Sequence, residues 1–110
     1  MNYSKLTDGE ISVLVGRLEN PKREVVPHEI NPKGAIIIRE FGGVRHKYGF
    51  FPLNLAEDGF QIITMSRIAL APSGKTSWRA THESGATASH RNPLRAAMIV
   101  YLMINEGRMG

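Results

Sequence analysis

The segment from Asn92 to Gly107 constrains the fold of this chain more than any other part of the sequence. Asn92 can cap a helix with its side-chain oxygen, Pro93 suits the first helical position, and Gly107 is typical of a helix end. The residues Leu94–Ile104 are apolar except for Arg95, so the predicted helix has little polar surface. Such a helix packs against a sheet on one side and against a further part of the same chain or a second protomer on the other. We expect this to be the core of the same chain, with self-association as the alternative.

A second helix is predicted near the start of the chain. The residues from Thr7 to Glu10 fit a capping box, in which the Thr7 hydroxyl and the Glu10 carboxylate each accept a backbone N–H. Leu6 and Ile11 flank the box as a hydrophobic staple, and apolar residues follow at helical spacing. Asn20-Pro21 ends the pattern.

Two strands flank the pair Gly42-Gly43, which tolerates the backbone angles of a tight hairpin turn. Residues 34–41 are rich in β-branched side chains, and residues 44–50 alternate apolar with basic or small residues, so one face is apolar and the other basic. Residues 20–33 contain three prolines and are predicted to be a connector, in which only Val25-Val26 suggests a short extended piece.

The segment 54–65 is ambiguous. Asn54 could cap a helix, whereas residues 60–65 would also suit a strand, and we favour the helix.

A second hairpin is predicted from residues 68–70 and 76–81, joined by a turn at Pro72-Ser73-Gly74. Residues 84–90 are small and polar and are interpreted as a surface loop.

These elements together predict an α+β fold. A chain of 110 residues supports one core, so residues 1–110 are expected to form a single domain. We expect an antiparallel β-sheet of about four strands in two hairpins, covered by the N-terminal and C-terminal helices, with a third short helix in the middle.

The chain carries 14 Lys and Arg against 10 Asp and Glu, a formal charge of +4. The excess lies in residues 21–48 and 75–110, each with a net charge of +3. This balance suits nucleic-acid binding and is equally typical of ordinary solubility charge, and whether the two segments form one face stays open. Because there is no Cys, disulfides and thiolate metal sites are excluded, and the cytosol is the expected compartment. We expect neither export nor membrane insertion.

No catalytic, cofactor or metal site is predicted. Ser73-Gly74-Lys75-Thr76 imitates the end of a phosphate-binding loop, but Ala69 stands where the first Gly should be, so a hairpin turn is the better interpretation. The four His lack metal-ligand spacing, and Glu57-Asp58 is the sole adjacent acidic pair beyond the first helix.

The predicted start of the last helix is the best candidate for a binding site. Unpaired N–H groups at a helix N-terminus favour anions, and cations stand around it. The candidate residues for anion or nucleic-acid contact are Lys75, Arg79, His90, Arg91 and Arg95. The alternative is that Arg91 and Arg95 pair with Glu83 or Glu106. Trp78 and Tyr48 could stack on bases, although Trp78 is interpreted first as a core anchor.

Both ends of the chain carry a family resemblance. Residues 1–8 with Glu10-Ile11, the segment 54–63 and above all Asn92-Pro93-Leu94-Arg95-Ala96-Ala97-Met98 resemble the NinX family of phage proteins. The resemblance implies a small protein of tailed phages and prophages, made in the host cytoplasm and without an assigned activity. It supplies no functional residues.

From these observations we expect a non-enzymatic phage accessory protein that acts by binding a host or phage protein, with no cofactor and no membrane partner. A homo-oligomer formed through the last helix is a further expectation. Nucleic acid bound through a basic face around residues 75–95 is the second hypothesis.

Overall fold

The computed structural model describes residues 2–109, which form two small sheets and several helices. The elements in chain order are the short helix η1 (Tyr3–Lys5), α1 (Asp8–Glu19), β1 (Glu24–Pro27), β2 (Ala35–Phe41), β3 (Val44–Phe50), α2 (Ala56–Met65), β4 (Ala69–Ser73), β5 (Ser77–Thr81), β6 (Thr87–His90), α3 (Pro93–Ile104) and α4 (Glu106–Met109). The α+β class is confirmed. No helix in this part of the chain is long and apolar enough to cross a membrane.

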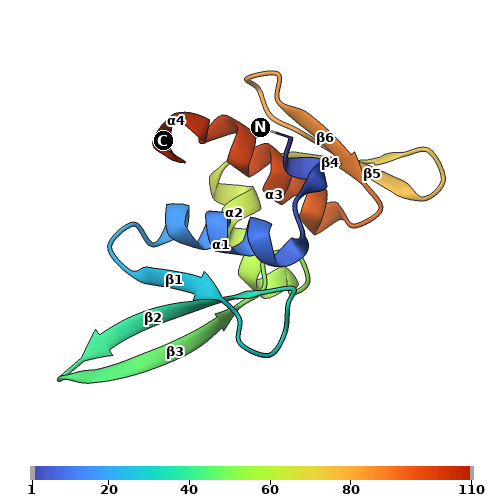
Figure 1. Cartoon of the computed structure of the whole chain (residues 1–110). Coiled ribbons are helices and arrows are strands. Elements are labelled where there is room, and N and C mark those ends of the chain that lie inside the picture. Colours follow the sequence, from blue (N-terminus) through green and yellow to red (C-terminus); the bar gives the residue numbers. More distant parts are fainter. Residues whose placement is uncertain (1, 110) are drawn as a thin grey trace.

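The strands form two separate antiparallel sheets, with the orders β1-β2-β3 and β4-β5-β6. Figure 1 shows the helices between these sheets: α1 packs on the first sheet, α3 packs on the second, and the two helices touch each other. The expectation of one sheet of about four strands is therefore wrong. Each predicted hairpin is present, but each recruits a third strand, and the helical layer keeps the two sheets apart.

The third strand of each sheet comes from a segment without a strong strand signal. Val25-Val26 lies in β1, which pairs with β2 from Glu24↔Ile38 to Pro27↔Ala35. The interpretation of residues 84–90 as a loop holds for residues 84–86 but is wrong for Thr87–His90, which pairs with β5. Small residues have little intrinsic preference for strands, but Ala88 packs against the core and the neighbouring strand satisfies the backbone groups.

The first hairpin turns at the predicted glycine pair, and the turn of the second hairpin lies two residues later than predicted. Gly42 and Gly43 have φ angles of +56° and +81°, as a two-residue hairpin turn requires. In the second hairpin Pro72 belongs to β4, and the turn is formed by Gly74, Lys75 and Thr76, with Gly74 at φ +69°.

The helices begin largely where the sequence predicts. The capping box of α1 is present, with Glu10 N–H donating to the Thr7 hydroxyl at 3.1 Å. Asn92 caps α3 by accepting the Leu94 N–H at 2.9 Å. The segment 54–65 is helical from Ala56, but its N-cap is Leu55 and no side chain caps it, so the predicted Asn54 cap is wrong. Helix α3 ends at Ile104, and Gly107 lies within α4.

The core forms around α3, as the apolar C-terminal segment predicts. Its residues from Arg95 to Leu102 are all buried, and Met98 and Leu102 are fully enclosed by elements of the same chain. Only the two ends of the helix reach the surface: Pro93 and Leu94 are half-buried, and Met103 is 36% exposed. The apolar side chains of α3 are thus used inside the chain, and the expected self-association through this helix has little apolar surface to draw on.

Gly9 marks the closest approach between α1 and the β1–β2 connection. A Cβ atom at this position would lie 2.2 Å from the carbonyl oxygen of Pro32, which is backbone and cannot swing aside. We expect Gly9→Ala to destabilise the protein by about 1–3 kcal/mol in urea denaturation, although alanine favours an ordinary helix by about 1 kcal/mol. Gly107→Ala is the matched control, since nothing lies near its Cβ. A Gly9→Ala protein as stable as wild type would contradict this packing.

Candidate functional site

The structure separates the five residues of the predicted anion site. Arg95 is buried, with only 8% of the residue exposed, and pairs with Asp8 at 2.5 Å. Its guanidinium also donates to the carbonyl oxygens of Ser4 and Leu6. The alternative pairing with Glu83 or Glu106 is therefore wrong for Arg95. This guanidinium holds the N-terminal segment onto α3 and has little surface left for an external anion.

Glu106 is engaged elsewhere, by the buried Tyr3. The Tyr3 hydroxyl donates to the Glu106 carboxylate at 2.9 Å, and burial together with that carboxylate raises the pKa of Tyr3 to about 12. A second tyrosine does the same between two helices, since the Tyr101 hydroxyl donates to Glu19. Burial is the main cause that raises the pKa of Tyr101. Both carboxylates therefore stabilise the fold by accepting hydrogen bonds from buried tyrosine side chains.

His90 is part of a turn and contributes little positive charge. Its Nδ1 atom accepts the Asn92 N–H at 2.9 Å, which requires that nitrogen to be unprotonated. Burial, followed by the charge of Arg95, lowers the pKa of His90, with Arg91 adding to the shift. At neutral pH the imidazole is therefore neutral, and the cation at this point of the surface is Arg91.

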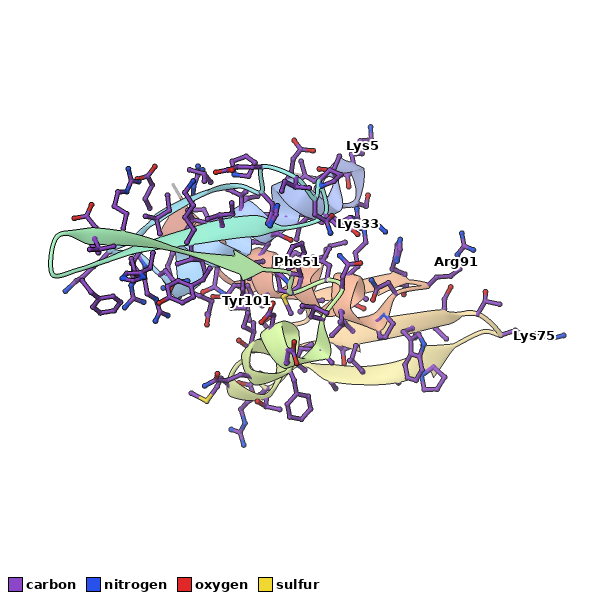
Figure 2. All side chains as sticks on the ribbon, turned by 90° about the horizontal axis from the view of Figure 1, so that it is seen from below. Lys5, Lys33, Phe51, Lys75, Arg91 and Tyr101 are labelled. Atoms are coloured by element: carbon purple, nitrogen blue, oxygen red, sulfur yellow. The ribbon has the colours of Figure 1, made fainter. Side chains whose placement is uncertain are left out.

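Lys75, Arg79 and Arg91 are exposed. Lys75 occupies the β4–β5 turn, and Arg79 lies on β5 with its guanidinium 3.4 Å from the Ser73 hydroxyl. Figure 2 shows Lys75 and Arg91 toward the end of the molecule away from the β2–β3 turn, with Lys5 and Lys33 nearer its middle in the same half. We call these four residues, Lys5, Lys33, Lys75 and Arg91, the basic end. Lys5 and Lys33 could not be predicted as part of this site, because isolated lysines carry no local signal.

The cations of the first basic segment behave differently. Across the first sheet, Arg45 pairs with Glu24 at 2.9 Å and Lys47 pairs with Glu29 at 2.7 Å. The hydrogen bond from Lys47 is the main cause that lowers the pKa of Glu29. Lys33 of this segment belongs to the basic end, but Arg45 and Lys47 are neutralised within their own sheet and Arg39 lies over the Tyr48 ring. The two basic segments therefore do not form one continuous basic face.

These ion pairs also explain a buried pair of side chains. Ile36 and Ile38 point away from α1 yet are only 6% and 9% exposed. Ile38 lies between Glu24 on β1 and Lys47 on β3 in the sheet register, so the long side chains that join β1 to β3 pass over the central strand. Their aliphatic stems cover the isoleucines while the charged ends stay in water.

The opposite face of the same hairpin carries exposed apolar side chains together with one cation, Arg39, whose guanidinium lies 4.9 Å from the Tyr48 ring. Phe41, Val44 and Tyr48 are 55%, 56% and 43% exposed, and His46 stands among them with its ring 5.7 Å from that of Phe41. Figure 1 shows the reason: the β2–β3 hairpin extends beyond the helices, so nothing covers its outer half. We call these four residues the hairpin surface. The alternation in the sequence predicts the apolar face correctly but does not reveal that it is exposed.

Trp78 is also outside the core. It is 37% exposed on β5, opposite His90 in the sheet register, so its interpretation as a core anchor is wrong. The core position on this strand is Ala80, which is fully buried where α3 packs on the sheet.

Polar groups with catalytic potential are used by turns and caps. His28, His82 and His90 each accept a backbone N–H from two residues further along the chain. Asp58 accepts the Phe51 N–H at 2.9 Å. The segment 73–76 is a hairpin turn and is not followed by a helix, as the departure from a phosphate-binding loop indicated. Within residues 2–109, no three His, Asp or Glu side chains gather in a way that could hold a metal ion.

Comparison with curated proteins finds no match. Comparison with protein families finds one that covers both ends of the chain and the region between them: the model described as "Bacteriophage P22, NinX" matches residues 2–105. This match includes the capped start of α1 and all of α3, the elements that carried the resemblance in the sequence. The chain therefore belongs to the NinX family of phage proteins.

Proposed function

We propose that this phage accessory protein acts in the host cytoplasm by binding a host or phage protein, and that it is not an enzyme. The observation that carries the proposal is the hairpin surface. Exposed apolar side chains that cluster on one face are typical of interaction sites, and aromatic residues are the side chains most often found at the centre of protein interfaces. Phe41 and Tyr48 fit that description, with Val44 beside them.

The proposal that no reaction is catalysed is supported by how the polar side chains are used. His28, His82 and His90 accept backbone N–H groups. Four carboxylates are each bound by a partner within the fold: Glu10, Glu19, Asp58 and Glu106. A general acid or base needs a free side chain in reach of a substrate, and these groups are committed to holding turns and helix ends.

A pull-down with tagged protein from phage-infected lysate tests the class of partner. We expect wild type to retain a stoichiometric protein after nuclease treatment, and Phe41→Ser with Val44→Ser to lose most of it. Ile30→Ser is the matched control, because it removes an 88% exposed apolar side chain away from the hairpin surface. Equal capture by wild type and the hairpin variant would refute a role for this surface.

A second candidate function, nucleic-acid binding, is favoured by the basic end. No ion pair within residues 2–109 involves Lys5, Lys33, Lys75 or Arg91, so their charges are available to phosphates. Contacts to a phosphate backbone release counterions, and this makes binding strongly dependent on salt.

If the basic end binds nucleic acid, affinity for duplex DNA or single-stranded RNA should fall steeply between about 50 and 200 mM salt. Lys75→Ala with Arg91→Ala should weaken binding and flatten the salt dependence. Lys22→Ala with Arg23→Ala removes the same charge from exposed positions outside the basic end and serves as the control. Fluorescence anisotropy measures both, and equal losses in the two variants would show that only total charge matters.

A further inference from the structure

A notch beside the end of β2 deepens the proposed function, on which this inference rests. β1 pairs with β2 only from Glu24↔Ile38 to Pro27↔Ala35, so residues 39–41 of β2 have no strand on that side within residues 2–109. Figure 1 shows β2 and β3 continuing past the start of β1. The space beside the end of β2 is a hollow of about 370 Å³, which we call the notch. It is lined by Lys22, Arg23, Glu24, Ile38, Arg39, Glu40 and Phe41.

Arg39 is the residue of the notch that the fold leaves least satisfied. The residue is half-buried, yet it forms no ion pair within residues 2–109. Its Nε atom is the one buried side-chain nitrogen or oxygen in this part of the chain without a hydrogen-bond partner. Buried polar groups are nearly always hydrogen-bonded, because an unsatisfied donor costs free energy. Arg39 therefore has no polar partner in the fold that explains its place, as we expect of a side chain that binds an acceptor from outside.

The Tyr48 ring holds the guanidinium of Arg39 without using its N–H groups. The guanidinium carbon lies over this ring, 4.9 Å from the ring centre. A cation over an aromatic face is attracted by the ring, and the N–H groups of the guanidinium stay available for hydrogen bonds. Two of these groups side by side match the two oxygens of a carboxylate. Arg39 thus presents a carboxylate-binding fork at the border between the notch and the hairpin surface.

The charges around the notch favour an anion. Lys22 and Arg23 are exposed, and within the described residues neither forms an ion pair, so with Arg39 the notch has three unpaired cations. Both glutamates of the lining instead lie near Arg45, at 2.9 and 3.9 Å. These four cations against two glutamates leave a net charge of +2.

The far side of Arg39 has the opposite charge. There Arg39 borders a second hollow, of about 330 Å³, whose lining includes Glu19, Glu57 and Asp58. Among residues 2–109 none of these carboxylates forms an ion pair with Arg39, and Glu19 and Asp58 accept hydrogen bonds elsewhere in the fold. A carboxylate from outside is repelled on that side, so it reaches Arg39 from the notch.

The backbone of β2 adds hydrogen-bonding groups to the notch. The His28 N–H donates to the Gly34 carbonyl, so the even-numbered residues of β2 bond toward β1 and the odd-numbered ones bond toward β3. Glu40 is the next even-numbered residue after Ile38, and no strand of the described residues lies opposite it on that side. Its N–H and C=O groups therefore face the notch, where an extended segment in line with β1 can pair with them.

We propose that the protein bound by the hairpin surface inserts one acidic side chain into the notch, where Arg39 binds its carboxylate together with Lys22 and Arg23. In an extended segment the residue two positions away lies on the same face as the acid, and there an apolar side chain covers Phe41. Phe41 belongs both to the notch and to the hairpin surface, so one segment reaches both. Arginine and aromatic side chains are the ones that most often dominate the energy of a protein interface.

A nucleic-acid backbone fits the notch less well than a single carboxylate does. Its phosphates follow one another at every nucleotide, so the neighbours of a bound phosphate would lie against Glu24 and Glu40. One carboxylate flanked by uncharged residues meets the three cations without this repulsion. A phosphate probe therefore distinguishes the two occupants.

Arg39→Gln and Lys47→Gln form a matched pair of variants. Each replaces a cation of the same hairpin by glutamine, but Lys47 lies on the other face of the sheet, where it is paired with Glu29. Because Arg39 has no polar partner in the fold, Arg39→Gln should unfold at nearly the same urea concentration as wild type. A large loss of stability would make Arg39 a structural residue and would overturn the inference.

The probe is a peptide with blocked ends and the sequence Thr-Val-Thr-Glu-Thr-Val-Thr, titrated into the isotope-labelled full chain and followed by NMR. We expect the amide signals of Glu40 and Phe41 to shift and to saturate. Arg39→Gln should weaken binding at least tenfold, because a hydrogen-bonded ion pair is lost, and Lys47→Gln by about twofold or less. The same peptide with glutamine in place of glutamate should bind wild type at least tenfold more weakly.

Three results would contradict the inference. A peptide that shifts no amide of residues 39–41 does not enter the notch. Equal affinity of the glutamine peptide, or of Arg39→Gln, shows that no carboxylate is bound there. If inorganic phosphate or a single-stranded oligonucleotide shifts the same amides at lower concentration than the peptide does, the occupant is a phosphate.

The pull-down separates this failure from failure of the proposed function. If Arg39→Gln still captures a nuclease-resistant partner that Phe41→Ser with Val44→Ser loses, the chain binds a protein through the hairpin surface but without a carboxylate in the notch. If wild type captures no such partner, the proposed function fails as well.

Discussion

Replacing Arg95 by alanine should destabilise the protein by about 3–5 kcal/mol. Arg95 is buried and its guanidinium reaches Asp8 and two backbone carbonyl oxygens, those of Ser4 and Leu6. Its removal leaves the Asp8 carboxylate, which is only 25% exposed, without a counterion and leaves two acceptors unpaired. The loss is measured as the free energy of unfolding in urea.

Arg91→Ala is the control for this prediction. Arg91 is four residues earlier in the chain, exposed and free of ion pairs among the described residues, so its removal should change stability by no more than about 0.5 kcal/mol. The sequence alone favours a small effect for both arginines, because an exposed ion pair is worth about 0–1 kcal/mol. Similar small losses in the two variants would mean that the Arg95–Asp8 pair is exposed or absent.

Leu102→Ala and Met98→Ala should each cost about 2–5 kcal/mol. Both side chains are fully buried on α3, against which the second sheet, α1 and α2 pack. Truncation removes apolar contacts and leaves a cavity that close-packed neighbours fill only in part. Each variant should unfold at a clearly lower urea concentration than wild type, with a similar slope.

Met103→Ala is the matched control on the same helix. This side chain is 36% exposed, so its truncation should cost much less than that of Met98. If Met98→Ala and Met103→Ala lose equal stability, the helix is rotated with respect to the core described above.

What the sequence predicts well is what local residues determine. The capping box at Thr7 and the Asn92-Pro93 start both act within one helical turn, so the starts of α1 and α3 could be predicted directly. The Gly42-Gly43 turn fixes the first hairpin in the same way. The dense apolar composition of α3 indicates its central position without knowledge of its neighbours.

What the sequence misses depends on partners far along the chain. Arg95 and Asp8 are 87 residues apart, and no local pattern connects them. β6 is a strand because β5 lies beside it, although its own residues resemble a loop. The hairpin surface follows from the length of the helices, which end before the hairpin does. An alternating pattern shows which side chains share a face but not whether anything covers that face.

The central claim is that this NinX-family chain binds a protein through the hairpin surface. The most direct measurement is the amount of nuclease-resistant partner captured from phage-infected lysate by wild type, by Phe41→Ser with Val44→Ser, and by Ile30→Ser, each first shown to unfold at the same urea concentration. We predict equal capture by wild type and Ile30→Ser and at least a tenfold loss in the hairpin variant. Undiminished capture by the hairpin variant would contradict the claim.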